Sequence, residues 1–389
     1  MIKSIVIGGL AIALATGGVD GLAQSLDDLN IQVHGYATQG FLYTTQNNLL
    51  TTRSSDGSPA WTEAVVNITA QPIRKLRFAV QGRYFLLGNL GNSIALDSAL
   101  ADYKWDDRFG VRFGKVKTPL GLFNEMQDID PGYMWALLPQ SVYPIQSRNT
   151  LLSHYGAVVY GILPLGQRLG KMEYRGWAGE RVLLNNDGYL LSQTQHGITL
   201  PNGLSGVTYG GALRWRTPLP GLLVGMSDYR NNNWSAVLSA AGGQLAGIEL
   251  IHPFNSQNVF VQYERNKWMA AAEYSRLPVS LSVNLDGMPP GPLRIDYRSW
   301  YAMASYKATS KLTVGAYDSQ FVDHQSALGP VRFSKDWTVS ARYDFNPFIY
   351  AKAEQHFIDG TAVGYDMNMN QNGLKPDTKL SILKVGVSF

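Results

Sequence analysis

The residues in this chain best suited to chemistry are arginines that recur at alternate positions. Arg77 and Arg83 lie in one alternating segment, and Arg214 and Arg216 lie in another. Apolar or aromatic residues fill the opposite parity of both segments, so a strand would present the guanidinium groups on one face. A guanidinium stays charged at any working pH. Rings of such groups around a narrow aqueous space would favour anions.

Catalytic and metal-binding motifs are missing from the sequence. The six histidines have no ligand spacing among them. The Cys count of 0 removes thiol nucleophiles, zinc ribbons and disulfides. Ser153 precedes His154, but no Gly-x-Ser-x-Gly elbow surrounds the serine. We expect no enzymatic activity, cofactor or metal ion, and we expect His154 to be a hydrogen-bonding group at the base of a loop.

Residues 1–23 have the pattern of a secretory signal. Lys3 precedes an apolar run at residues 5–15, and small residues lie just before Gln24. The alternative is an N-terminal transmembrane anchor, but the run is shorter than the ~20 residues that span a bilayer. We therefore expect an exported protein whose mature part is residues 24–389.

Composition favours short strands and tight turns. Among 389 residues, Gly is 40 and Tyr is 21, whereas charged residues make up only 16%. The formal net charge is +4, and no basic run has interleaved aromatics, so we expect no nucleic-acid partner. The length allows two or three globular domains or one large barrel.

Period-two alternation between turn residues recurs through the mature chain and predicts β-strands. Residues 76–86, 207–217 and 335–345 are the clearest examples. In a soluble sandwich the apolar face packs on a core. In a membrane barrel it faces lipid, around a wet lumen. Alternation alone leaves both folds open.

The lengths of the connections favour the barrel. Short connections are predicted at residues 71–74, 106–108, 165–170, 218–221, 265–267, 309–311 and 346–347. Long connections are predicted at residues 44–59, 118–150, 184–206, 231–255, 278–295, 322–334 and 359–378, and residues 88–93 are a short member of this second set. Such alternation is typical of an up-and-down outer-membrane barrel. We predict an all-β, antiparallel transmembrane β-barrel of about 16 strands with an aqueous channel and both termini at the rim of short turns.

Residues 115–144 are the most distinctive connection. Four prolines exclude a central strand. Side chains such as Tyr133 and Trp135 make the segment too apolar to be fully exposed to solvent. A loop of this length is usually functional, and we predict that it folds into the barrel. Lys115 and Lys117 have the parity of an outward-facing phenylalanine, so we place them at the base of the loop, beyond the membrane.

The last strand has its apolar residues on one parity and ends in Phe389. Here the sequence resembles the general porins of Gram-negative outer membranes, which close the barrel with an alternating strand that ends in an aromatic residue. The chain departs from many of them at Val387, where they have a second aromatic. The resemblance covers the architecture of the mature chain and is nearest in kind to the branch that includes phosphate-selective porins. It implies a homotrimer in contact with outer-membrane lipid, and an assembly signal at Phe389.

The resemblance also implies that acidic residues of the inward loop face basic residues of the wall. Glu125, Asp128 and Asp130 would be the acidic side. The basic residues of inward parity are Arg77, Arg83, Arg112, Arg214, Arg216, Arg342, Lys352 and Lys384. The alternative for each is a salt bridge within the wall, to acids such as Glu173 or Glu354.

These observations predict a non-enzymatic channel for passive diffusion of small hydrophilic solutes, with a modest preference for anions. One alternative is a substrate-specific channel with a binding site for phosphate or a sugar. Another is an outer-membrane enzyme, such as a phospholipase, or a purely structural barrel.

Overall fold

The architecture comes from a computed structural model, which describes residues 29–183, 187, 190, 193–194, 197–286 and 291–389. The predicted signal and Gln24 lie outside the described residues. Among the residues described, no helix is both long and apolar enough to cross a membrane.

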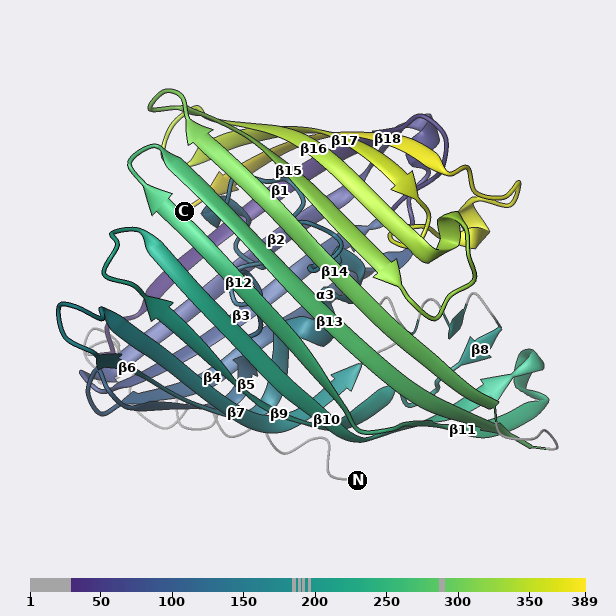
Figure 1. The fold of residues 1–389 in the computed structure, drawn as a ribbon, viewed down its shortest axis with the longest axis horizontal. Coiled ribbons are helices and arrows are strands. Elements are labelled where there is room, and N and C mark those ends of the chain that lie inside the picture. The colour runs from purple at the N-terminus through teal and green to yellow at the C-terminus, as the bar shows by residue number, and fades with distance from the viewer. Residues whose placement is uncertain (1–28, 184–186, 188–189, 191–192, 195–196, 287–290) are drawn as a thin grey trace, which may run out of the picture.

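Antiparallel strands close into a barrel (Figure 1). Nearly every strand pairs with its neighbour in the chain, and β1 (Gln32–Thr44) closes the ring against β18 (Asp377–Ser388). The other strands are β2 (Ser58–Ile73), β3 (Leu76–Leu87), β4 (Asn92–Lys104), β5 (Gly110–Lys117), β6 (Ser153–Pro164), β7 (Lys171–Leu183), β8 (Ile198–Thr199), β9 (Leu204–Arg216), β10 (Leu222–Ala240), β11 (Leu245–Ile251), β12 (Phe254–Arg265), β13 (Trp268–Leu285), β14 (Gly291–Lys307), β15 (Leu312–Asp323), β16 (Phe333–Asp344) and β17 (Ile349–Gly360).

The barrel wall has sixteen strands, which confirms the predicted fold. The sheet contains 18 strands in the described chain, but β8 lies in the connection between β7 and β9. In addition, β11 and β12 are successive parts of one wall strand, because both pair with β10 and with β13. Eighteen less these two gives sixteen. Helical segments are short: α3 (Arg148–Leu152) and the 3-10 turns η1 (Ser54–Asp56), η2 (Gly88–Leu90), η3 (Asp130–Gly132), η4 (Ile145–Ser147), η5 (Ala241–Gly243), η6 (Pro330–Arg332) and η7 (Met367–Met369).

Short turns lie at one rim and longer connections at the other (Figure 1). Phe389 lies at the rim of short turns, where its backbone exchanges two 3.0 Å hydrogen bonds with Gly35. Two predicted loops, residues 231–255 and 278–295, were wrong. There β10 and β11 continue as a hairpin that pairs Trp234 with Ile251, and β13 and β14 continue their ladder to Val283 and Gly291. The sequence hides these extensions because turn-forming residues interrupt them, as at residues 231–233, residues 242–243 and Pro278.

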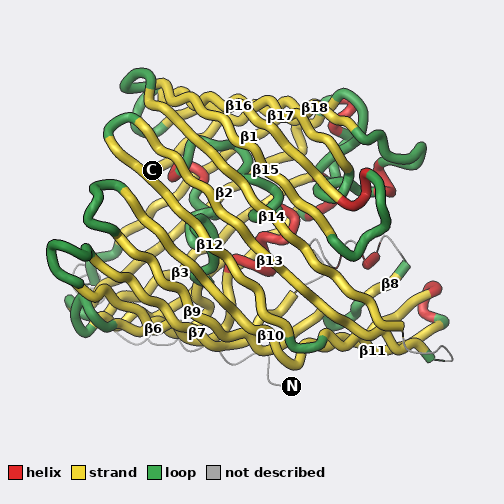
Figure 2. Tube along the Cα trace, in the orientation of Figure 1, coloured by secondary structure: helices red, strands yellow, loops and turns green. Residues whose placement is uncertain are grey.

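The apolar face of each strand points away from the lumen. On β18, Leu383 and Val385 are 60% and 52% exposed, whereas the alternating Ile382 and Lys384 are 1% and 2% exposed. Exposed aromatics such as Trp268 and Phe348 lie near the short turns, as expected for an interfacial girdle. The polar parity therefore faces inward, where Figure 2 shows loop and helical segments inside the ring of strands.

Candidate functional site

Residues 118–147 leave the wall after β5, cross the lumen, and return to β6 through η4 and α3. This is the predicted inward loop, which we call the lumen loop. It begins later than predicted, since β5 continues through Lys117 and includes Lys115. Thr118 and His154 fix its base through a 2.9 Å hydrogen bond between Oγ1 and Nδ1.

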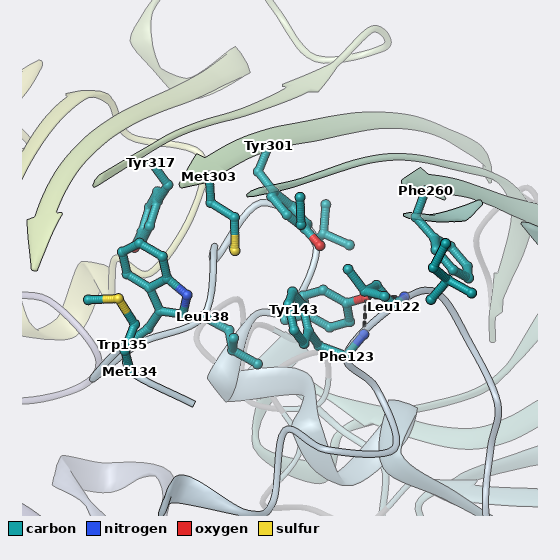
Figure 3. Close-up of a cluster of buried hydrophobic side chains, with 13 residues drawn as sticks. Leu122, Phe123, Met134, Trp135, Leu138, Tyr143, Phe260, Tyr301, Met303 and Tyr317 are labelled. Atoms are coloured by element: carbon teal, nitrogen blue, oxygen red, sulfur yellow. Dashed lines mark hydrogen bonds between the residues drawn. The ribbon is translucent and has the colours of Figure 1, made fainter. Parts of the chain in front are cut away.

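Apolar packing holds the lumen loop against β12–β15 (Figure 3). The ring of Trp135, fully buried, meets Tyr317 edge to face with centroids 5.2 Å apart. Phe123 and Tyr143 pack beside Tyr301 in the same cluster. Burial of large aromatic side chains is the main stabilising contribution in such a contact.

A second part of the wall contacts the same loop. Ala136 and Leu137 pack in a second apolar cluster that includes Trp61 on β2 and Leu380 on β18. Two consecutive backbone amides, those of Ala136 and Leu137, donate to the Glu354 carboxylate over 2.7 and 3.0 Å. The loop therefore spans the lumen and is fixed on both sides.

Two glycines make room for these contacts. A Cβ at Gly315 on β15 would lie 2.8 Å from the Trp135 ring, so this inward position must lack a side chain. Gly121 has a φ of +54°, and a Cβ there would lie 2.1 Å from the Glu273 carboxylate. Only glycine adopts this conformation at little cost.

Asp130 is the central anionic group of the lumen loop. Its carboxylate lies 3.0 Å from Lys352 Nζ, forms an ion pair with Lys384, and accepts a 2.7 Å hydrogen bond from Tyr350. The Lys352 ammonium also donates to the carbonyl of Trp135 over 2.9 Å. Burial by itself would raise the pKa of the Asp130 carboxyl, but the two lysines outweigh it and hold that pKa well below its usual range.

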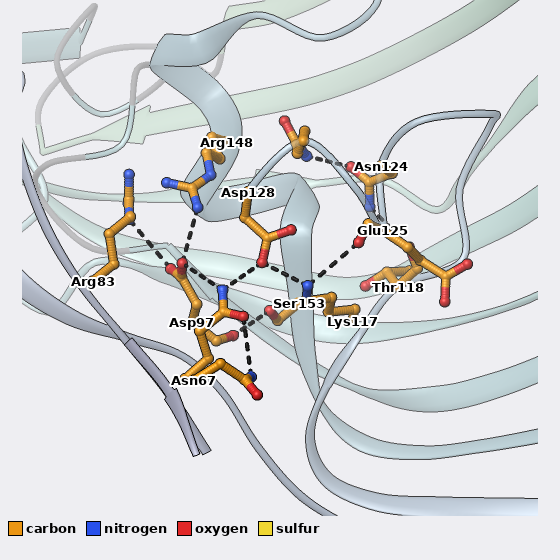
Figure 4. Close-up of polar contacts among 12 residues, drawn as sticks. Asn67, Arg83, Asp97, Lys117, Thr118, Asn124, Glu125, Asp128, Arg148 and Ser153 are labelled. Carbon is orange, nitrogen blue, oxygen red and sulfur yellow. Dashed lines mark hydrogen bonds and ion pairs between the residues drawn. The ribbon is translucent and has the colours of Figure 1, made fainter. Parts of the chain in front are cut away.

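Asp128 forms a second buried contact near the loop base (Figure 4). Its carboxylate lies 2.6 Å from Lys117 Nζ and accepts a 2.5 Å hydrogen bond from Gln81. Lys117 therefore reaches into the lumen. Lys115 instead donates to the Leu96 carbonyl and lies 5.2 Å from the exposed Tyr155 ring on the outer side.

Arg148 and Arg83 share one carboxylate (Figure 4). Arg148 Nη2 lies 2.9 Å from Asp97 and its Nη1 lies 3.1 Å from Glu63, while Arg83 Nε lies 3.3 Å from Asp97. All four side chains are at most 8% exposed. Arg83 is therefore a buried partner of the loop's return segment.

Glu125 faces a more open group of arginines toward the short-turn rim. Its carboxylate lies 2.8 Å from Arg175, 3.6 Å from Arg214 and 3.8 Å from Arg112. Arg216 pairs with Glu173. This is the salt bridge within the wall that the sequence analysis named as the alternative for such arginines.

Other groups complete the turn side of the lumen. Arg77 and Arg112 share Asp102, at 3.0 and 3.2 Å. Arg342 pairs with Asp344 and donates to the carbonyls of Pro131 and Tyr133 in the lumen loop. We call this region the turn-side vestibule: Arg77, Arg112, Arg175, Arg214, Arg216 and Arg342 with Asp102, Glu125, Glu173 and Asp344.

The structure thus divides the predicted basic residues into two groups. Arg83, Lys352 and Lys384 are buried against the lumen loop, and the other five lie in the turn-side vestibule. Sequence reasoning missed Arg175, although it shares the parity of Glu173 and could have been found from it. It also missed Arg148, which follows the loop and has no pattern to mark it.

The remaining catalytic candidate does not form a nucleophile pair. Ser153 Oγ donates to the Asp97 carbonyl over 2.5 Å, while His154 bonds to Thr118. In the described part of the chain, no group of three or more His, Asp or Glu side chains is placed to hold a metal ion.

A small cavity lies between the lumen loop and the wall strands β2, β3 and β18. It measures about 30 Å³ and is lined in part by Glu63, Gln127, Tyr133, Gln140 and Arg148. A water molecule needs roughly 10–15 Å³ of such volume. The cavity is therefore large enough for water and for little else.

Comparison of the sequence with models of known families and with curated proteins finds no match. Solved structures share the fold. OmpF of Salmonella typhi aligns with a TM-score of 0.58 at 14% identity, over 93% of this chain and 98% of that one. An anion-selective porin from Comamonas acidovorans aligns with a TM-score of 0.54 at 11% identity, over 92% and 99%. The outer-membrane channel DcaP of Acinetobacter baumannii aligns with a TM-score of 0.52 at 10% identity, over 92% and 97%. The chain therefore has the porin fold.

Proposed function

We propose that this protein is an outer-membrane porin through which small hydrophilic solutes diffuse, with a modest preference for anions. The observation that carries the proposal is the lumen loop, which narrows a closed sixteen-strand barrel next to a basic vestibule. The vestibule holds six arginines and four carboxylates, which leaves a net charge of +2. Export through residues 1–23, a homotrimeric assembly and the absence of enzymatic activity belong to the same proposal.

The anion preference rests on the arginines that stay accessible. The side chains of Arg77 and Arg216 are 47% and 60% exposed, whereas those of Lys352 and Lys384 are at most 2% exposed and are paired with Asp130. Positive groups that line a water-filled passage favour anions. Charges buried in ion pairs contribute little to that field.

The test is the reversal potential of the purified protein in planar bilayers under a KCl gradient. The wild type should be weakly anion-selective. The Arg77→Ala/Arg216→Ala variant should shift toward cations, and the preference should decrease at high salt because mobile ions screen the charges. A cation-selective wild type, or a double variant with unchanged selectivity, would contradict the proposal.

A substrate-specific channel is the second candidate, and the tight packing of the lumen loop favours it. The loop is fixed by buried aromatic packing and by ion pairs to the wall, so it narrows the passage with a defined shape. Conductance that saturates with rising phosphate or sugar concentration would identify such a channel. Conductance that rises linearly with KCl and is not blocked by either solute would identify a general porin.

A further inference from the structure

A second charged cluster lies on the outer face of the barrel. Arg276 on β13 and Arg298 on β14 are direct partners in the ladder. They have the parity of Tyr274 and Trp300, whose side chains are exposed on the outer surface. Glu273, of the opposite parity, is buried in the lumen. Both guanidinium groups therefore point away from the channel.

The positive side chains of this cluster outnumber its negative ones. Like charges directly opposite each other destabilise a sheet, and Asp296 compensates only in part. Its Oδ1 lies 3.0 Å from Arg276 Nε, and its Oδ2 lies 2.9 Å from Arg298 Nη2. Arg294, next on the same parity, is exposed and adds a third positive charge. Three arginines and one aspartate leave a net charge of +2.

Donor groups of this cluster remain free to meet a ligand. The side chains of Arg276 and Arg298 are 45% and 42% exposed. Beside them lies a groove of about 510 Å³, lined in part by Arg276, Arg294 and Asp296 and by Asn255 and Gln257. This volume is within the ~300–1,000 Å³ typical of ligand sites.

The position of the cluster on the wall indicates its partner. On β13 the outward residues from Trp268 to Tyr274 are aromatic or alanine, and on β14 the same holds from Trp300 to Tyr306. Aromatic side chains mark the two membrane interfaces of a barrel. Arg276 and Arg298 come one outward position beyond Tyr274 and Trp300, toward the rim of long loops. They therefore lie at the level of the lipid headgroups.

We propose that Arg276, Arg294 and Arg298 bind a phosphate group on the headgroup of a membrane lipid, whose polar remainder occupies the adjoining groove. Guanidinium groups match phosphate oxygens with paired hydrogen bonds. Basic pockets at membrane surfaces bind anionic lipid headgroups in this way. The proposal rests on the proposed membrane location but is independent of conduction.

The test measures binding of a bisphosphorylated glucosamine lipid to the full-length barrel in detergent, read as the ligand-dependent rise in unfolding temperature. The Arg276→Ala/Arg298→Ala variant should bind about 100-fold more weakly, taken as roughly tenfold per charge-assisted contact. The Arg265→Ala/Lys311→Ala variant removes two charges at the short-turn rim and should bind like the wild type. Asp296→Asn removes the carboxylate that competes with the ligand for both arginines, so this variant should bind the lipid several-fold more tightly. A gain in affinity cannot come from a damaged fold, so it would show that the arginines themselves recognise the lipid.

Three outcomes would overturn the assignment. One is unchanged affinity in the Arg276→Ala/Arg298→Ala variant. Another is equal binding of the dephosphorylated lipid. The third is equal stabilisation by inorganic phosphate alone, which would identify a free anion as the ligand.

Discussion

The carboxylate of Asp130 in the lumen loop lies 3.0 Å from the ammonium group of Lys352 on β17, and both side chains are buried inside the barrel. Lys384 on β18 pairs with the same carboxylate. One loop carboxylate thus pairs with two wall lysines that the sequence places on the inner face. Inward parity on a barrel strand is therefore not the same as exposure to a channel.

Asp130→Asn should loosen the lumen loop. The substitution leaves Lys352 and Lys384 buried without their counter-charge, and loss of one partner of a buried pair costs ~3–5 kcal/mol. We expect faster protease cleavage within residues 118–147 and larger current fluctuations in bilayers. Asp56→Asn, at an exposed acid of another connection, is the matched control. Identical cleavage rates for both variants would contradict this role of Asp130.

The docking of the loop should resist moderate acid. Because the pKa of Asp130 is lowered in the folded state, its stabilisation is fully present above the unfolded pKa of ~3.9 and is lost as the pH falls through the folded value. Conductance of the wild type should stay constant from pH 7 to about pH 5 and change only in stronger acid. In Asp130→Asn this acid transition should be absent. A wild-type transition at about pH 6 would point to another group.

Glu125→Gln should strengthen the anion preference. The carboxylate of Glu125 is shared by Arg112, Arg175 and Arg214, so its removal adds one net positive charge to the turn-side vestibule. Reversal potentials should move toward that of chloride. Arg175→Ala should move them the other way, and Asp56→Asn, at an exposed acid of a long connection, should leave them unchanged. If Glu125→Gln moved the selectivity toward cations, the charges of the turn-side vestibule would not be what determines the ion selectivity.

Trp135→Ala should increase single-channel conductance. Removing a fully buried tryptophan costs ~3–5 kcal/mol, and here the loss falls on the contact between the loop and Tyr317. Gly315→Leu tests the same contact from the wall side, since its side chain would occupy the place of the Trp135 ring. Both variants should conduct more than the wild type. Unchanged conductance in both variants would mean that the contact between the lumen loop and β15 does not limit the passage of ions.

Deletion of Phe389 should impair assembly of the barrel. The terminal residue exchanges two backbone hydrogen bonds with Gly35, where β1 and β18 close the ring, and its ring lies against Gly35. Phe389→Ala keeps the backbone bonds and removes only the ring. If the aromatic ring is the assembly signal, both variants should lower the yield of heat-modifiable barrel in the membrane fraction. Normal yield of Phe389→Ala together with failure of the deletion would assign the effect to the hydrogen bonds.

The sequence by itself determined the barrel, because the information is local. Alternation places Leu383 and Val385 outside and Lys384 inside, and the side-chain period of a strand fixes this whatever the strand pairs with. Short and long connections likewise set the two rims. Local composition was misleading where β10 and β13 extend into predicted loops, and at the base of the lumen loop, where β5 continues through Lys117.

Only the tertiary structure decided which charges meet. Lys352 and Lys384 lie 222 and 254 positions from Asp130 in the sequence, and Glu273 lies 130 positions from Tyr143. The local sequence pattern does not predict these pairs. They form when a proline-rich loop, which has neither strand nor helix periodicity, packs against two parts of the barrel wall. Wall residues next to the loop became buried ion pairs, and those nearer the short turns stayed accessible. Chemically identical arginines, such as Arg83 and Arg77, therefore lie in different environments.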